Sequence, residues 1–268
     1  MKRTLGLALG AGGARGIAHI GFLKAMEEEG IRPDFISGSS MGSIVGACYA
    51  KGMTPDDMKE YVQNISPRDI VDLGILTPSR LGLMRWTKVR KMMAELIGHC
   101  SFSDLQIPFS CVSVDIKKGK LIHFTEGDVT DAILASSSIP SVFRPVEKDG
   151  MILVDGGVFC RVPAAQVKQL GADVVVAVDV LGKLRHPEKI GNVISLVTRI
   201  YDLVEDKNAK SCRRSLRRVT DLWLEPDMGD ISQYQMKYHP AVYDAGYKLG
   251  KENAAKIRQL LQTDGERE

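Results

Sequence analysis

A serine flanked by glycines lies near the start of the chain, in Gly38-Ser39-Ser40-Met41-Gly42. This G-x-S-x-G pattern is typical of a sharp turn between a strand and a helix, where the serine hydroxyl is exposed as a nucleophile. Its surroundings fit, because apolar residues precede it and small residues follow it within Phe35 to Ala47. A plain Gly-Ser turn would give the same letters, so the pattern makes Ser40 a candidate nucleophile.

A glycine-rich segment, Gly10 to Gly16, offers a second kind of chemistry. Amides in such a loop at the start of a helix can converge on an anion, either a phosphate or a reaction oxyanion. As a dinucleotide fingerprint it matches in part, since Gly12 fits, Arg15 replaces the third glycine, and Asp34 is near the position of the ribose-binding acid. A Rossmann-like nucleotide-binding oxidoreductase is therefore one alternative, whereas a P-loop is excluded because no Gly-Lys-Ser or Gly-Lys-Thr follows.

A carboxylate follows the apolar run Met151 to Val154, in Asp155-Gly156-Gly157. An Asp-Gly pair is ordinary turn chemistry. The end of a strand in an open α/β sheet is also the usual position for catalytic groups. Asp155 is therefore a candidate for either role.

The elements that would position these residues alternate between strands and helices. Apolar runs predict strands at Leu5–Leu9, Asp34–Ser37, Phe109–Val114, Lys120–Phe124, Met151–Val154 and Val174–Val180. Helical periodicity, caps and stop signals predict helices at Ile17–Glu29, Met41–Lys51, after Thr54, after a cap at Thr87, near Pro163–Leu170, from Glu188 to about Arg218, and near Ala241–Leu261. This alternation favours a mostly parallel sheet covered by helices, in one domain over residues 1–268.

A fourth block, Ala135-Ser136-Ser137-Ser138-Ile139-Pro140, completes an ordered set: glycine loop, G-x-S-x-G, A-S-x-x-x-P and D-G-G. This order resembles the patatin-like phospholipase family over about residues 5–180, with a helical part over about 186–268. The resemblance implies a three-layer α/β/α fold with a mostly parallel central sheet. It also implies a lipid acyl hydrolase, such as a phospholipase A, a lysophospholipase or an esterase. A lipid-binding regulator with vestigial chemistry is the remaining alternative.

Residue roles follow from the resemblance by position. Ser40 is the implied nucleophile, Asp155 its partner, and the amides of Gly12 and Gly13 the oxyanion hole. The sequence departs from the family pattern at Ala11, where many members have another glycine. A methyl group at this position would narrow the oxyanion hole.

Substrate-binding roles are expected for Arg15 and Met41. The Arg15 side chain would either reach a phosphate head group or neutralise groups near the glycine loop.

A carboxylate with a pKa near 3.9 is a poor base for an alcohol, so an aspartate partner must be positioned and partly desolvated. Histidines are the alternative base, because His186 or His239 after Ser40 and Asp155 would reproduce the order of an α/β-hydrolase triad. His19 is expected to pack beneath the glycine loop. The remaining histidines, His99 and His123, have no acid or serine at motif spacing.

Charge and cysteine content narrow the class of partner. The 36 Lys and Arg against 33 Asp and Glu give a net charge of +3, too mild to imply nucleic acid. Five widely spaced cysteines without a C-x-x-C pair favour a reducing compartment and a cytoplasmic location. The first residues imitate a signal peptide, but their apolar run is short and rich in glycine. No metal or cofactor is expected, and the oligomeric state stays open.

Any membrane contact should be peripheral, because no run reaches the roughly 18 apolar residues of a bilayer span. The segment Leu73 to Gly98 is basic and apolar, and is expected to act as a lid, an interface or core. Leu81 to Trp86 is the better interface candidate, since the helix after it fits the core. A second basic run, from Lys207 to Arg218, is expected to be a solvated helix face.

Overall fold

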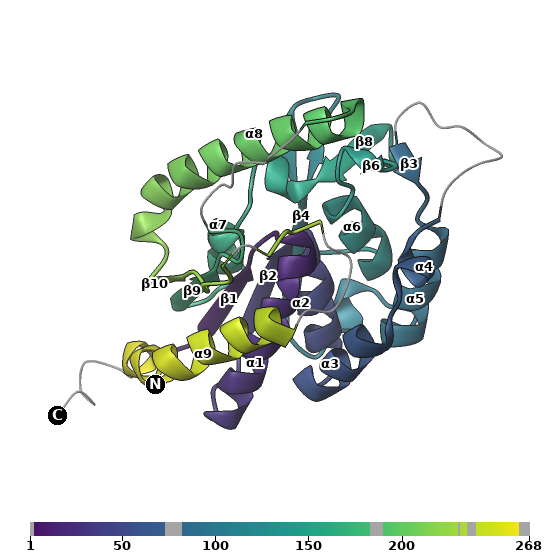
Figure 1. The fold of residues 1–268 in the computed structure, drawn as a ribbon. Coiled ribbons are helices and arrows are strands. Elements are labelled where there is room, and N and C mark those ends of the chain that lie inside the picture. Colours follow the sequence, from purple (N-terminus) through teal and green to yellow (C-terminus); the bar gives the residue numbers. More distant parts are fainter. Residues whose placement is uncertain (1–2, 73–81, 183–189, 230, 235–239, 263–268) are drawn as a thin grey trace.

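The computed structural model describes residues 3–72, 82–182, 190–229, 231–234 and 240–262. Its centre is an eight-stranded sheet in the order β10-β9-β1-β2-β4-β8-β7, with β5 also paired to β4 (Figure 1). The parallel strands are β10 (Leu222–Leu224), β9 (Val174–Val178), β1 (Leu5–Leu9), β2 (Phe35–Ser39) and β4 (Phe109–Asp115). Antiparallel pairs add β5 (Lys120–Phe124), β8 (Met151–Asp155) and β7 (Val146–Lys148). The predicted, mostly parallel sheet is confirmed.

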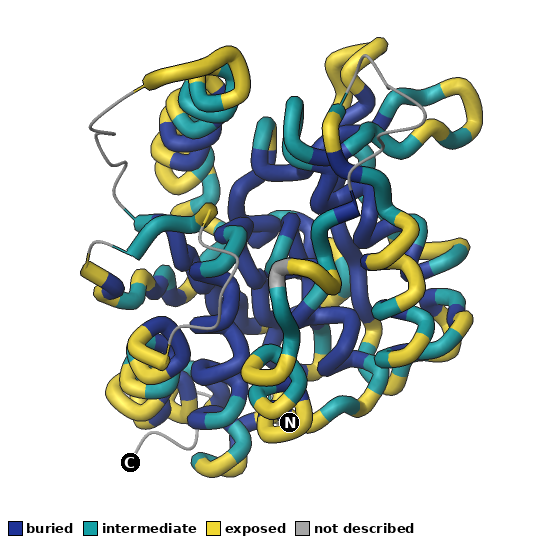
Figure 2. The backbone as a smooth tube through the Cα atoms, turned by 45° about the vertical axis from the view of Figure 1, so that its right-hand side comes forward, coloured by how far each residue is buried: buried dark blue, intermediate teal, exposed yellow. Residues whose placement is uncertain are grey.

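The central strands are buried on both faces. Every residue of β1 and of β9 is buried, which explains their continuous runs of Leu, Ala and Val. Figure 2 shows these strands as a dark blue interior beneath partly exposed helices.

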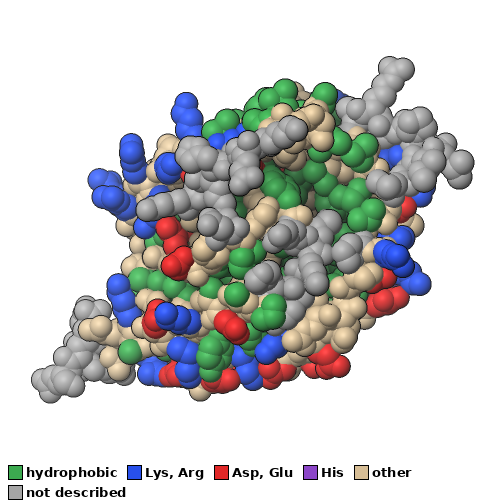
Figure 3. All heavy atoms as spheres, viewed as in Figure 1, with side chains coloured by type: hydrophobic (Ala, Val, Ile, Leu, Met, Phe, Trp, Pro, Cys, Tyr) green, Lys and Arg blue, Asp and Glu red, His purple; other side chains and the backbone are tan. Residues whose placement is uncertain are grey.

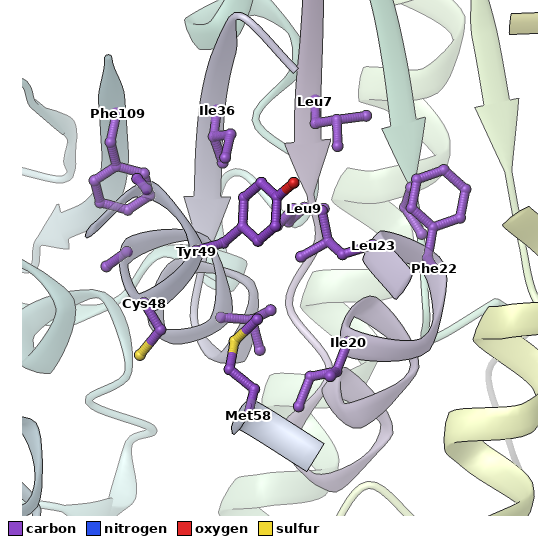
Figure 4. Packing of buried hydrophobic residues seen from close by; sticks show 14 of the residues in the cluster. Leu7, Leu9, Ile20, Phe22, Leu23, Ile36, Cys48, Tyr49, Met58 and Phe109 are labelled. Atoms are coloured by element: carbon purple, nitrogen blue, oxygen red, sulfur yellow. The ribbon is translucent and has the colours of Figure 1, made fainter. Parts of the chain in front are cut away.

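One large apolar core lies against the sheet. Leu7 and Leu9 of β1 pack there with Ile20 and Phe22 of the first helix (Figure 4). The helices that contribute are α1 (Ile17–Glu28), α2 (Met41–Lys51), α3 (Pro55–Asn64), α5 (Thr87–Ile97), α6 (Val129–Ser136) and α9 (Pro240–Leu261). A short helix, α4 (Pro67–Ile70), lies between α3 and α5 in the chain.

A smaller apolar cluster contains alternate residues of the same strands, among them Ala8 and Val175. Val167 of α7 (Ala164–Gln169) packs into it. Helices therefore cover both faces of the sheet, which gives a three-layer α/β/α fold. The longest of the described helices, α8 (Val193–Ser215), crosses the top of Figure 1 and contacts the short 3₁₀ turn η3 (Gly156–Val158) that follows β8.

The register of β4 brings two distant segments end to end. A strand has only two hydrogen-bonding edges, and β5 pairs with Cys111 to Asp115 of β4. Both β2, which pairs up to Val112, and β8, which pairs from Ser113, must therefore use the opposite edge. The strand β8 runs toward the end of β2, so Asp155 finishes beside the residue that follows Ser39.

Several elements differ from the sequence-based expectations. The helix α6 was not predicted, nor were the short strands β7, β10, β3 (Gly82–Met84) and β6 (Ser141–Phe143), the last two of which pair with each other. Thr87 was expected to cap its helix, but it is the first helical residue and Trp86 occupies the capping position. The helix expected from Glu188 to about Arg218 corresponds to α8, which begins at Val193 in the structure. Glu188 itself lies outside the described residues. None of the described helices is both long and apolar enough to span a bilayer.

Candidate active site

Ser40 occupies the turn between β2 and α2, as its motif predicts. Its backbone has φ 52° and ψ −125°, a left-handed conformation that costs a non-glycine residue about 1–3 kcal/mol. The two glycines of the motif allow close approach, because a Cβ on Gly42 would overlap the Leu9 carbonyl and one on Gly38 would overlap Ser43. The strained turn presents Ser40 at the amino end of α2, where helix amides favour negative charge.

The Ser40 hydroxyl donates a hydrogen bond to Asp155, with 2.6 Å between Oγ and Oδ2. Both side chains are buried. The other carboxylate oxygen of Asp155, Oδ1, accepts from the Gly157 amide at 2.8 Å and from the Tyr201 hydroxyl at 3.2 Å. Asp155 therefore uses one oxygen to hold the turn and the other to hold Ser40.

Burial raises the pKa of Asp155 to about 6, even though hydrogen bonds from Ser40, Gly157 and Tyr201 act to lower it. Burial also raises the pKa of the Tyr201 phenol, which therefore stays protonated and able to donate. Behind Tyr201, burial raises the pKa of Glu205 well above its usual range and favours its neutral form. The site thus holds a carboxylate that is more basic than an exposed aspartate.

The glycine loop follows β1 and is held by its backbone. The Gly10 amide donates to Val178 and the Ala11 amide to Arg161, at 3.0 and 2.9 Å. Farther on, the Ala14 amide donates to Gln233 at 2.9 Å and the Arg15 amide to Gly12 at 3.0 Å.

Between these bonds, the amides of Gly12 and Gly13 have no acceptor among the described residues. Gly13 lines the same cavity as Ser40. An oxyanion hole requires amides without an acceptor beside the reacting serine, so this role of Gly12 and Gly13 stays a prediction.

Arg15, which was expected to bind substrate, is not among the residues that line the cavity containing Ser40. It is buried, and its guanidinium donates to the carbonyls of Leu181, Ile231 and Gly229 at 2.7, 2.8 and 3.2 Å. Of its two expected roles, the structure therefore favours neutralising carbonyls near the loop. Met41, by contrast, lines the cavity, and its role in substrate binding stays a prediction.

Two other residues near the loop have structural positions. Ala11 is buried and is not among the residues that line the cavity. His19 packs beneath the loop as expected, and its Nε2 donates to the Gly10 carbonyl at 2.8 Å. Burial lowers the pKa of His19 to about 4, so it is neutral at pH 7.

A cavity of about 540 Å³ opens at Ser40 and runs between α2, α3, α5 and the start of α8. Its walls are mostly apolar, with Ile44, Met58, Trp86 and Phe143 among them. Trp86 stacks on Phe143 with 4.2 Å between ring centroids. A pocket of this size and composition suits an apolar ligand whose polar end reaches Ser40.

The basic segment after residue 72 divides between core and surface. Val89, Met93 and Ile97 of α5 are buried, as a core helix requires. Trp86 faces inward and Leu83 is 50% exposed, whereas Leu73 to Leu81 lies outside the described residues.

Three contributors to the site were missed by sequence reasoning. The Ser136 hydroxyl accepts from the Ser40 amide at 3.0 Å, so the A-S-x-x-x-P block supports the turn directly. The Gly157 amide and the Tyr201 hydroxyl hold Asp155. The D-G-G block carries a signal for Gly157, but nothing in the sequence near Tyr201 points to Asp155.

Nucleotide binding, a histidine base and a metal site would each depend on other residues. Asp34 accepts from the Leu5 amide at 2.7 Å, at the start of β1 and thus at the opposite end of the strand from the glycine loop, where it cannot bind a ribose. His186 and His239 lie outside the described residues. Among the residues that the structure does describe, no group of three His, Cys, Asp or Glu side chains could hold a metal ion.

Comparison with known proteins identifies the family and the fold. The family model of patatin-like phospholipases matches residues 7–168. An uncharacterized NTE family protein of Mycobacterium tuberculosis is 37% identical over 183 residues, which are 68% of this chain and 51% of that protein. Lysophospholipase NTE1 of Coccidioides immitis is 28% identical over 284 residues, 93% of this chain and 17% of that protein. The chain therefore spans about half, or less, of the length of these curated relatives.

Among solved structures, VipD from Legionella pneumophila has a similar fold, with a TM-score of 0.56 and 13% identity over 97% of this chain and 66% of that one. At this identity the likeness concerns the fold alone. The family model, however, covers more than half of the chain and contains all four ordered motifs. The chain therefore belongs to the patatin-like phospholipase family.

Proposed function

We propose that this chain hydrolyses acyl esters of lipids, with Ser40 as nucleophile and Asp155 as its general base. One observation carries the proposal, namely the 2.6 Å hydrogen bond from Ser40 to Asp155 at the end of an apolar cavity. A nucleophile bonded directly to its base is the usual geometry of covalent acyl transfer.

In the first half of the reaction, Ser40 Oγ attacks the ester carbonyl carbon while its proton passes to Asp155 Oδ2. The carbonyl oxygen becomes an oxyanion, which the amides of Gly12 and Gly13 stabilise as hydrogen-bond donors. The intermediate then collapses, the bond to the alcohol breaks, and Asp155 returns the proton to the leaving oxygen. The acyl group remains on Ser40.

In the second half, Asp155 takes a proton from water, whose oxygen attacks the acyl carbon. Collapse of this second intermediate returns the proton to Ser40 and releases a carboxylic acid. A pKa of about 6 leaves Asp155 mostly ionised at neutral pH and makes it a stronger base than an exposed aspartate. Tyr201 and Gly157 keep the carboxylate oriented through the cycle.

The cavity supports a long acyl chain as the group that Ser40 receives. Its mostly apolar walls enclose about 540 Å³ next to the serine. Because one of the relatives is a lysophospholipase, a lysophospholipid is the first natural substrate to test. Such a substrate resides in membranes or micelles, so peripheral contact with a lipid surface is part of the proposal.

The test compares Ser40→Ala and Asp155→Asn with the parent, by release of p-nitrophenol from a medium-chain acyl ester. Each substitution should lower kcat on the order of 10⁴-fold, because the nucleophile and its base act as a unit and loss of either removes most of the catalytic effect of both. Two exposed counterparts, Ser103→Ala and Asp149→Asn, serve as matched controls and should match the parent. Circular dichroism establishes that all four variants are folded.

A fluorophosphonate probe separates the alternatives. It should label the parent on Ser40 and leave Ser40→Ala unlabelled. Labelling without turnover on any acyl ester would indicate a lipid-binding regulator, and tight binding of NAD without labelling would indicate an oxidoreductase. Replacement of His186 or His239 by Gln should leave kcat/KM within about tenfold of the parent, since a dyad needs no histidine.

A further inference from the structure

The outward face of α8 is unusual for a surface helix, because its exposed side is apolar and its buried side is polar. Val193, the most exposed of these apolar side chains, is 74% exposed. The exposed apolar residues on this face, here named the apolar stripe, are Val193, Leu196, Ile200, Leu203 and Val204. The buried side carries Tyr201, Glu205, Asp206 and Ala209. Core packing therefore does not account for the apolar stripe, and exposed apolar patches usually mark interaction sites.

The same face becomes cationic toward the end of the helix. Lys207, Lys210 and Arg214 continue the spacing of three and four residues set by Val193, Leu196, Ile200 and Leu203, so they share its orientation. With Arg217 and Arg218 they form the cationic end, and all five are exposed. Lys210 pairs with Asp206 at 2.6 Å, but in the described part of the chain no carboxylate pairs with Lys207 or Arg214. The predicted solvated basic face is thus confirmed. The apolar stripe next to it on the same helix was not predicted.

Figure 3 shows both parts on one side of the molecule. Apolar side chains gather along the upper edge where α8 begins, and cations project at the upper left where α8 ends. Close to the start of α8, β6 contacts the helix and pairs with β3, which carries the exposed Leu83.

The apolar stripe also adjoins the cavity. Ile194, Ser195 and Thr198, on the neighbouring side of the same turns, line the cavity that contains Ser40. Whatever covers the apolar stripe therefore lies next to the cavity and to the route toward the serine.

We propose that the outward face of α8 docks on an anionic lipid bilayer, with the apolar stripe inserted among the lipids and the cationic end on their head groups. Apolar and cationic side chains on one helical face are the composition of interfacial helices. Cations near an anionic bilayer add attraction that depends on their distance from the surface. Docking in this orientation would place the cavity next to the bilayer, which contains the acyl lipids. Only this last point rests on the proposed function.

A second copy of the chain fits the face less well. Two parallel α8 helices in contact would bring their cationic ends together, and two antiparallel ones would place each cationic end on the partner's apolar stripe. A second copy would also lie beside the cavity and restrict entry. A lipid bilayer instead supplies anionic and apolar groups together.

The test measures binding to large unilamellar vesicles by sedimentation, using phosphatidylcholine alone and with about a third phosphatidylserine. The variants are Leu196→Gln with Ile200→Gln, and Lys207→Gln with Arg214→Gln. Each pair should weaken binding to the anionic vesicles at least about tenfold. Two pairs serve as controls. Leu196→Met with Ile200→Met keeps the apolar stripe apolar, and Lys248→Gln with Lys256→Gln removes two positive charges from α9 instead of α8. Both pairs should bind as the parent does.

Catalysis is kept apart from binding in this design. Ser40→Ala should bind vesicles as tightly as the parent, so a failure of the proposed function would not remove the docking result. Each variant should keep the parent's thermal midpoint and, on a soluble short-chain ester, its rate within about twofold. Binding unchanged by the α8 pairs would overturn the proposal. So would a dimer in sedimentation analysis that Leu196→Gln with Ile200→Gln converts to monomer.

Discussion

At the scale of the residue, the two oxygens of Asp155 have different partners, and this division sets the strength of the base. Oδ2 faces Ser40, while Oδ1 accepts from Gly157 and Tyr201. Burial raises the pKa of the carboxyl to about 6, and each of these three donors opposes the rise. A change at Oδ1 should therefore alter the basicity of Asp155 without touching the oxygen that receives the proton.

Tyr201→Phe tests this directly. It removes the donor at 3.2 Å from Oδ1, so the pKa of Asp155 should rise further above its ordinary value. Because the ionised carboxylate is the base, the rising limb of kcat/KM against pH should move to higher pH, with a plateau within about tenfold of the parent. The matched control is Tyr247→Phe, which removes a hydroxyl bonded to Glu28 at 2.6 Å and should leave the limb in place. An unmoved limb in Tyr201→Phe would show that the phenol plays no part in tuning Asp155.

The same pKa predicts a cost in stability. A carboxyl whose pKa is about 6 when folded and near 3.8 when unfolded binds protons more tightly in the folded state, so the protein loses stability as pH rises through that window. Asp155→Asn removes the buried charge and should raise the free energy of unfolding by up to about 3 kcal/mol at pH 7.5. The gain should shrink as pH falls from about 6 to about 4, where the parent carboxyl is protonated. Urea unfolding at several pH values measures it, and a gain independent of pH would contradict the assignment.

At the scale of the element, glycines set how closely helices approach. A Cβ on Gly246 of α9 would overlap the Ala18 carbonyl of α1, because the two helix backbones touch there. Gly246→Ala must push the helices apart and should lower the free energy of unfolding by about 2 kcal/mol. Lys256→Ala, on the exposed side of α9, should change it by less than about 0.5 kcal/mol. Urea denaturation measures the free energy of unfolding of both variants. Equal values for the two would mean that α1 and α9 move apart without loss of stability.

The sequence predicts elements where a local pattern exists. The parallel strands β1 and β9 are almost continuous apolar runs, and α5 shows a clear period of 3.6 residues, so both kinds of element were predicted. The helix α6 was missed because all of its residues except Asp131 are buried, so it shows no apolar period. Three-residue strands such as β3, β6 and β10 are too short to show alternation.

The motifs pointed to the residues of the candidate site but not to its geometry. The motif order singled out Ser40 and Asp155, which are hydrogen-bonded in the structure, and their catalytic roles stay a prediction. The close approach at Gly38 and Gly42 explains why the G-x-S-x-G pattern is informative. Asp155 was expected at the end of a strand and lies there, but nothing predicted that β8 is antiparallel and meets β2 end to end along β4. This arrangement depends on pairing between segments far apart in the chain, which no local pattern reports. The contact of Tyr201 with Asp155 depends in the same way on where α8 crosses the sheet.

At the scale of the whole molecule, the distribution of charge matters more than its sum. The net charge is only +3, yet α8 concentrates exposed cations at one end, next to exposed apolar side chains. Elsewhere many charges are paired across elements, as in the bond of Lys251 on α9 to Glu29 at 2.5 Å and the buried pair of Arg161 with Asp179. Lys207 and Arg214 pair with no carboxylate in the described part of the chain, so this side of the molecule is the one that we expect an anionic surface to attract.

This asymmetry predicts how salt should affect turnover. Salt screens exposed charges, with a Debye length of about 10 Å at 0.1 M and about 3 Å at 1 M, but it hardly alters the buried bond between Ser40 and Asp155. Raising NaCl from about 0.05 M to about 0.5 M should therefore lower hydrolysis of a lysophospholipid in anionic vesicles severalfold. Hydrolysis of a soluble short-chain ester should stay nearly constant, and so should hydrolysis in neutral vesicles, where the cationic end has no partner. If salt lowered all three rates equally, it would be acting on the catalytic site, and the cationic end of α8 would have no part in bringing the substrate to Ser40.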